Sequence, residues 1–207
     1  MIFMIVKINF RDQVKNLLLD KMKSGFLKPE QSLSLASLAR ELEVSVTPIR
    51  EALTQLEQSH IVRAIPNKGF VIPELTKDEA KNLYELVSHI EILALENSTY
   101  TSNKLKKLQK QQEKFEKSTT GIKRINADMD FHTLLTSGYK NSVALQILSE
   151  LKTRIFFYEI DFFENNTSLS NSENHHQQII DALINNNKKE AANLLLENWM
   201  QILTINT

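Results

Sequence analysis

Residues 33–56, LSLASLARELEVSVTPIREALTQL, constrain the fold most, because their apolar side chains repeat at helical spacing in two short blocks. Steps of three and four residues place each block on one face of an amphipathic helix. Ser45 and Thr47 both favour a helix N-cap, and Pro48 suits a first helical turn. We therefore predict two helices joined by a tight turn, the second beginning near Thr47. The blocks are Leu35, Leu38, Ala39 and Leu42, then Ile49, Ala52, Leu53 and Leu56.

The second of these helices has the side-chain distribution of a DNA recognition helix. Its apolar block accounts for the inward face, which leaves Ser45, Val46 and Arg50 near the exposed start or on the outer face. In helix-turn-helix proteins the first residues of the second helix contact base edges in the major groove. We expect Ser45, Val46, Thr47 and Arg50 to contact DNA.

A small β-hairpin is predicted after this helix, in residues 60–75, HIVRAIPNKGFVIPEL. The turn formers of residues 66–69 separate two short runs rich in β-branched and aromatic residues. Arg63 lies on the first strand, and Lys68 and Gly69 lie at the tip. A basic hairpin of this kind is suited to contact the DNA backbone, and a solvated hairpin is the alternative.

The run SVTPIREAL, residues 45–53, resembles the recognition-helix signature of the GntR family of bacterial transcription regulators, usually Ser-Arg-x-Pro-Val-Arg-Glu-Ala-Leu. Ile49 is a conservative replacement, and Val46 stands where the family usually has arginine. The resemblance implies a winged helix-turn-helix over residues 1–75, with three helices and a hairpin wing. Its partner would be a double-stranded DNA operator, read as a palindrome by a homodimer.

Beyond residue 75 the sequence changes to long helical patterns separated by short polar loops. Thr76 and Glu79 form a capping box at the entrance. Only four Gly and four Pro occur in 207 residues, which favours a mainly α protein. We predict that residues 76–207 form an all-α, six-helix effector-binding and dimerisation domain. Its helices should span residues 78–97, 103–118, 122–137, 142–162, 171–184 and 188–202.

A carboxylate and two histidines form the second informative pattern. Asp128 and His132 are four residues apart on a predicted helix and so share a face, and His176 lies on the apolar face of a later helix. One carboxylate and two imidazoles can hold a divalent transition metal and leave positions open for a small oxygen ligand. Asp and His also occur at such spacings without a metal, so a metal-free ligand pocket and a degenerate site remain alternatives.

These three residues also resemble the FCD effector domain of one large GntR branch, in which Asp, His, His and a final His bind a metal. Asp128, His132 and His176 match the first three positions, and Asn198 occupies the fourth. An asparagine amide oxygen is a poorer transition-metal ligand than imidazole. The resemblance implies zinc or nickel as the cofactor and an effector-binding role for this domain.

Arg154 is the candidate effector contact, because its planar guanidinium can pair with a small carboxylate. A salt bridge to Glu150 or Glu159 is the alternative. We expect a transcription regulator, not an enzyme, whose operator affinity changes when the effector binds. The alternative from another class is a metal-dependent hydrolase that uses the Asp/His cluster, but no general base stands at a defined spacing from it.

Several large aromatic side chains and His89 are expected to be core or dimer-surface groups. The apolar residues of helix 142–162 occupy more of its circumference than one subunit can bury, which favours a homodimer. The other residues concerned are Trp199, Phe156, Phe157, Tyr158, Phe162 and Phe163.

The composition further limits the kinds of metal site, cross-link and partner that the chain can have. The absence of cysteine excludes disulfides and thiolate metal sites. The apolar start MIFMIVK is too short to span a bilayer, so we expect a cytoplasmic protein with no membrane partner. Residues 1–75 contain ten Lys+Arg and eight Asp+Glu, and residues 76–207 contain fifteen and seventeen, so the halves carry +2 and −2. That excess is too small to predict DNA binding without the motif.

Overall fold

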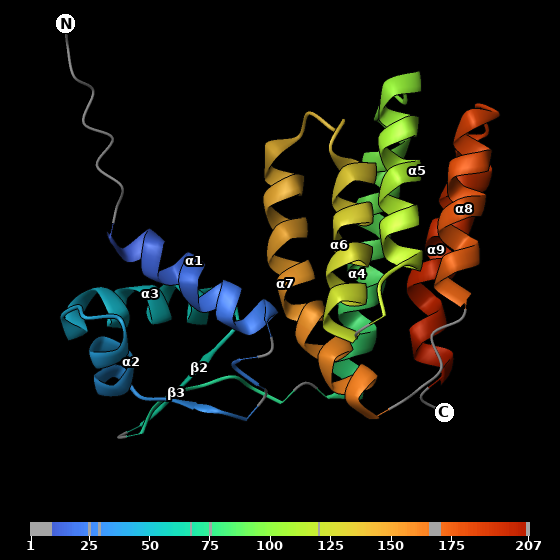
Figure 1. Cartoon of the computed structure of the whole chain (residues 1–207). Helices are drawn as coiled ribbons and strands as arrows, with labels where there is room; N and C mark the ends of the chain where they lie inside the picture. The colour runs from blue at the N-terminus through green and yellow to red at the C-terminus, as the bar shows by residue number, and fades with distance from the viewer. Residues whose placement is uncertain are drawn as a thin grey trace, which may run out of the picture. The chain divides into compact units, whose positions relative to one another are not determined.

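Figure 1 shows the computed structural model, which describes residues 10–205 apart from residues 25, 29, 67, 75, 120 and 166–170. The described chain is mainly helical, as predicted. It divides into two compact units, the first ending at Glu74. Each unit has its own helices and its own buried core.

Three helices form the frame of the first unit: α1 (Phe10–Lys23), α2 (Leu35–Glu41) and α3 (Val46–Gln58). Ser45 has the extended backbone of an N-cap, so α3 begins one residue before the predicted Thr47. Pro48 consequently lies in the first turn of α3, where a missing N–H leaves no helical hydrogen bond unmade. The predicted helix pair and its tight turn are confirmed.

A three-stranded antiparallel sheet in the order β1-β3-β2 completes this unit. The predicted hairpin is β2 (Arg63–Ile65) with β3 (Gly69–Val71), although Asn67 of its turn lies outside the described residues. The additional strand β1 (Ser32–Leu33) pairs with β3 and was not predicted, because two residues show no periodicity.

The core of the first unit forms where α1 packs against α3. The inward residues of α3 have no exposed surface, which confirms the periodicity of the second apolar block. Burial of four such side chains contributes more free energy to folding than the helix propensity of α3 can. The buried residues are Val14, Leu18 and Met22 from α1, and Ile49, Ala52, Leu53 and Leu56 from α3.

The second unit is a helical bundle in which α4 packs against α6, α7 and α9 (Figure 1). Inward-facing side chains of α4 therefore meet three other helices. Glu79 N donates a hydrogen bond to Thr76 Oγ1 at 3.2 Å, which is the N-cap half of the predicted capping box. The Glu79 carboxylate pairs with Arg154. The described helices are α4 (Lys77–Glu96), α5 (Ser102–Glu116), α6 (Gly121–Thr136), α7 (Ser142–Asn165), α8 (Asn171–Ile184) and α9 (Lys188–Ile205).

Most aromatic side chains of the second unit lie in its interior. Trp199, Phe156 and Phe157 are each 2% exposed, whereas Tyr158 is partly buried and His89 is exposed. The side chains of Phe162 and Phe163 lie outside the described residues. None of the described helices combines the length and apolar character needed to cross a bilayer.

Candidate DNA-binding surface and metal centre

The start of α3 presents the side chains expected to contact DNA. Ser45, Thr47 and Arg50 are exposed, and Val46 is 39% exposed. All four lie opposite the buried face of the helix or at its N-cap. The positions are therefore accessible to a ligand without any change in the core of the unit.

The hairpin places two more cations on the surface of the same unit. Arg63 on β2 and Lys68 in the turn are both exposed. Glu57 Oε1, on α3, accepts a hydrogen bond from Ala64 N at 2.9 Å, which ties β2 to the helix. Gly69 has a φ of +92°, and an added Cβ would lie 2.8 Å from the Leu33 carbonyl oxygen. Glycine is thus required for strand pairing, whatever its contact with DNA.

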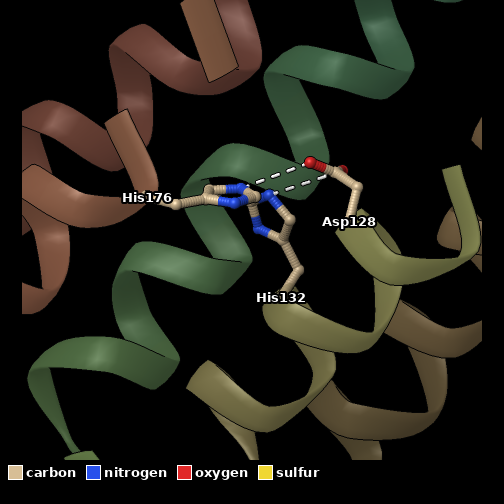
Figure 2. Close-up of side chains that lie close together, drawn as sticks. All are labelled: Asp128, His132 and His176. Atoms are coloured by element: carbon tan, nitrogen blue, oxygen red, sulfur yellow. Dashed lines mark ion pairs between the residues drawn. The ribbon is translucent and has the colours of Figure 1, made fainter. Parts of the chain in front are cut away.

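Two helices of the second unit bring the candidate metal ligands together. Figure 2 shows Asp128 and His132 projecting from α6 toward His176 of α8. One ligand atom from each residue lies within 4.8 Å of the other two. His176 Nε2 is 3.2 Å from Asp128 Oδ1, and His132 Nε2 is 3.8 Å from Asp128 Oδ2. Both histidines are almost fully buried, whereas the Asp128 side chain is 15% exposed.

Glu91 of α4 determines which nitrogen of His132 faces this cluster. His132 Nδ1 and Trp199 Nε1 each lie 2.7 Å from Glu91 Oε2, and Lys152 Nζ lies 2.5 Å from Glu91 Oε1. Burial raises the pKa of Glu91, but Lys152 and His132 outweigh it and lower that pKa to about 2. An ionised carboxylate can only accept hydrogen bonds, so His132 Nδ1 carries a proton and Nε2 is the nitrogen that faces Asp128.

His176 occupies an equally enclosed position. Its ring stacks on Phe131 with centroids 3.9 Å apart and an interplanar angle of 16°. Its Nδ1 lies 2.9 Å from Gln112 Oε1 of α5. Burial lowers the pKa of His176 despite the nearby Asp128, so the neutral ring is favoured. Burial raises the pKa of Asp128, but His176 and His132 hold that pKa below its usual value.

These residues fit a divalent transition metal. His132 Nε2 and His176 Nε2 are buried and have no hydrogen-bond partner among the described residues. Buried polar atoms are normally paired, and two such nitrogens beside a carboxylate form the N,N,O donor set of many transition-metal sites. Glu91 and Gln112 are the kind of outer partners that orient metal-binding histidines. The chemistry of the donors therefore supports the predicted site.

The other candidate residues lie in the same helical unit. Asn198, at the fourth ligand position, is 4% exposed. Arg154 Nη2 pairs with Glu79 Oε1, so the partners named in the alternative, Glu150 and Glu159, are not the ones that it uses. Arg154 Nε is buried and has no hydrogen-bond partner within the described part of the chain.

Glu159 of α7 is also buried in this unit, at 3% exposed. Burial raises the pKa of Glu159 well above its usual value, and Asp128 adds to the effect, although Tyr84 opposes it with a hydrogen bond.

The sequence reasoning missed the residues that support the two histidines: Glu91, Lys152 and Gln112. The sequence did indicate Glu91 and Gln112, because each is a polar residue within an apolar stripe of its helix. Glu91 follows Leu83 and Val87 at steps of four, and Gln112 lies four residues after Leu108. A polar residue at such a position is buried when the helix packs, and it then needs a specific partner.

The winged helix and the helical domain with its enclosed polar centre together define a DNA-binding transcription regulator with a ligand-binding domain. Comparison with known families agrees. Residues 10–72 match the family model described as "Bacterial regulatory proteins, gntR family", and residues 82–199 match that of the FCD domain. The chain belongs to the GntR family, in the branch that carries an FCD domain. The hydrolase alternative finds no support in these comparisons.

Individual relatives are regulators of the same kind. The chain is 38% identical over 111 residues to the HTH-type transcriptional regulator McbR of Escherichia coli (strain K12), covering 49% of this chain and 50% of that protein. It is 29% identical over 159 residues to the uncharacterized HTH-type transcriptional regulator YdhC of Bacillus subtilis (strain 168), covering 74% of this chain and 69% of that protein.

The solved structure of E. coli McbR/YncC is similar to this chain, with a TM-score of 0.80 and 26% identity over 96% of this chain and 97% of that one. A putative GntR regulator from Rhodococcus sp. RHA1 shares the fold, with a TM-score of 0.79 and 20% identity over 94% of this chain and 96% of that one.

Proposed function

We propose that this regulator binds a divalent transition metal, zinc or nickel, through Asp128, His132 and His176. The observation that carries the proposal is a pair of buried Nε2 atoms that lie beside the Asp128 carboxylate and have no hydrogen-bond partner among the residues that the structure describes. Asn198, at the fourth ligand position, would bind the metal only weakly, because an amide oxygen is a poor transition-metal ligand. A three-residue site of this kind leaves coordination positions open for a small oxygen ligand.

The effector in this proposal is a small carboxylate that binds in the helical domain. A bound metal would supply a positive charge for its oxygens. Arg154 is the second candidate contact, because its Nε has no hydrogen-bond partner in the described chain while Nη2 pairs with Glu79. Effector binding would change operator affinity only through different affinities for the two conformations of the regulator.

We further propose that the protein acts in the cytoplasm as a homodimer on a palindromic operator, with one winged helix on each half-site. Ser45, Val46, Thr47 and Arg50 of α3 would contact bases. Arg63, Lys68 and Gly69 of the hairpin would contact the DNA backbone. Exposed apolar side chains on α4 and α7 support subunit pairing: Leu86, Leu93, Val143 and Ile147.

The metal proposal is tested by elemental analysis of protein purified without chelator. We expect about one zinc or nickel per chain, lost in His132→Ala and retained in His175→Ala. His175 is the matched control, because it neighbours His176 but its Nε2 lies 4.0 Å from Glu197 and outside the cluster. Equal metal contents in the two variants, or no metal in the unaltered protein even after incubation with zinc and nickel, would overturn the proposal.

The effector proposal is tested by measuring operator affinity with and without a panel of small carboxylates. A carboxylate that shifts the affinity of the unaltered protein should lose that effect in Arg154→Ala, which removes the guanidinium. Glu79→Gln is the control, because it removes the charge that pairs with Arg154 but leaves the guanidinium in place. An unchanged response in Arg154→Ala would exclude Arg154 as the effector contact.

A further inference from the structure

We propose that Gln112, oriented by Glu116, is a positioning residue that holds His176 as the Nδ1–H tautomer. The unprotonated Nε2 then faces Asp128. The link runs along one face of α5, from exposed Glu116 through buried Gln112 to the ring of His176 on α8. Its consequence for metal affinity rests on the proposed metal site, but the tautomer itself does not.

The orientation of the Gln112 amide follows from its partner on α5. Gln112 Nε2 donates to Glu116 Oε1 at 2.9 Å, and the carboxylate there is an acceptor. A flipped amide would place its oxygen against the carboxylate oxygen, so that two acceptors met. Glu116 therefore directs the amide nitrogen of Gln112 to itself and leaves Gln112 Oε1 to face His176.

The tautomer of His176 follows from this orientation. An amide oxygen only accepts, and Gln112 Oε1 lies 2.9 Å from His176 Nδ1, so the ring must donate from Nδ1. A neutral imidazole carries one ring proton, so in the neutral ring that proton is on Nδ1 and the lone pair is on Nε2. Stacking on Phe131 holds the plane of the ring, so the lone pair has a defined direction.

This arrangement favours a cation over a metal-free site. His176 Nε2 lies 3.2 Å from Asp128 Oδ1. With the ring proton on Nδ1, a lone pair on Nε2 faces this carboxylate oxygen and no proton lies between them. The opposite tautomer would place a proton on Nε2 and satisfy Asp128, but only by losing the hydrogen bond to Gln112. The hydrogen bond to Gln112 thus keeps the Nε2 lone pair of His176 available for a metal, because it prevents His176 from donating a hydrogen bond from Nε2 to Asp128.

The tautomer can be read directly from long-range ¹H–¹⁵N correlation spectra of the metal-free full-length protein at pH 8. We expect His176 with Nδ1 protonated in the unaltered protein and with Nε2 protonated in Gln112→Met. Glu116→Met removes the orienting carboxylate from an exposed position and should mix the tautomers. Glu116→Gln should mix them too, because its amide can donate as well as accept and so no longer fixes the orientation of Gln112.

Gln111→Met is the matched control, because this neighbouring glutamine donates to the Ala127 carbonyl oxygen at 2.9 Å instead of contacting His176. The spectrum of this variant should show His176 in the same tautomer as in the unaltered protein. Protonation of His176 on Nε2 in the unaltered protein, or an unchanged tautomer in both Gln112→Met and Glu116→Met, would overturn the inference.

Cobalt titration followed by visible absorption measures the consequence for metal binding. Loss of an outer partner of a metal-bound histidine should weaken Co²⁺ binding about 10- to 100-fold in Gln112→Met. Gln111→Met should bind Co²⁺ as the unaltered protein does. If the unaltered protein binds no Co²⁺, the proposed metal function fails, whereas the tautomer spectra still decide the role of Gln112.

Discussion

Arg50 lies on the exposed side of α3, one residue beyond the buried Ile49 and so without a part in the core. Because Val46 offers no hydrogen bond at the position where relatives usually have arginine, Arg50 is the cation best placed to read a base from α3. We predict that Arg50→Ala weakens operator binding by about 1–3 kcal/mol and leaves the fold unchanged.

A gel-shift titration with operator DNA measures this loss, and circular dichroism checks the fold. Lys81→Ala, which removes an exposed cation from α4, is the control for net charge. Equal operator affinities for Arg50→Ala and Lys81→Ala would contradict the assignment of α3 as the recognition helix.

Glu91 makes the stability of the protein depend on pH in the acid range. Its pKa is about 2 in the folded protein against an ordinary value of 4.5, so between these pH values the unfolded chain binds more protons. The stabilisation is therefore complete above about pH 4.5 and is lost as the pH falls toward 2. We expect this loss to be on the order of 3 kcal/mol.

Urea unfolding at a series of pH values should show the decline in the unaltered protein. Glu91→Gln should be less stable at neutral pH, because Lys152 loses its buried ionic partner. The same variant should show a smaller decline below pH 4.5. Parallel curves for the two proteins would rule out Glu91 as the source of the pH dependence.

Among the secondary structure elements, the hairpin depends on a single backbone position. Gly69 begins β3 with a positive φ, and its Cα approaches the Leu33 carbonyl so closely that a methyl group would lie at 2.8 Å. We predict that Gly69→Ala lowers the free energy of unfolding of the first unit by more than about 1 kcal/mol, because alanine is strained at this φ.

Thermal unfolding measures this loss, and operator binding should weaken with it because the hairpin carries Lys68. Lys68→Ala separates the two effects, since it removes the cation without straining the backbone. That variant should weaken operator binding with little change in unfolding temperature. A Gly69→Ala protein as stable as the unaltered one would show that the pairing of β1 with β3 tolerates a side chain.

The helices were predicted closely because their signals are local. Apolar residues at steps of three and four mark α4 to α9, and Thr76 caps α4 as the sequence indicates. The strand β1 was missed for the opposite reason, since Ser32 and Leu33 become a strand only when Val71 and Phe70 lie opposite them. A two-residue segment is too short to show an alternating pattern, so its pairing with a strand distant in sequence cannot be predicted from it.

At the scale of the whole molecule, the proposed recognition of a palindromic operator requires two subunits. Leu93 on α4 and Val143 on α7 are 45% and 65% exposed, and α4 packs against α7. We predict that Leu93→Glu combined with Val143→Glu converts the protein to a monomer, because charges would be buried in the subunit interface.

Sedimentation or light scattering gives the mass, and DNA titrations compare a palindrome with a single half-site. Ile184→Glu on α8, also an exposed apolar position at 54%, is the matched control and should remain dimeric. The double variant should lose affinity for the palindrome but keep its weak affinity for one half-site. A dimeric double variant would place the interface elsewhere.

The sequence by itself determined the two-part organisation, the boundaries of α4 to α9 to within about three residues, and the identity of Asp128, His132 and His176 as a group. Helical periodicity and capping act over a few residues, so they can be read without a structure. The tertiary structure alone decided which groups surround that cluster. Glu91, Gln112 and Lys152 come from α4, α5 and α7, and they meet the histidines only because these helices pack together. Hydrogen bonds between distant segments depend on packing geometry, so the tautomers of the two histidines follow from the fold and not from the spacing of residues along the chain.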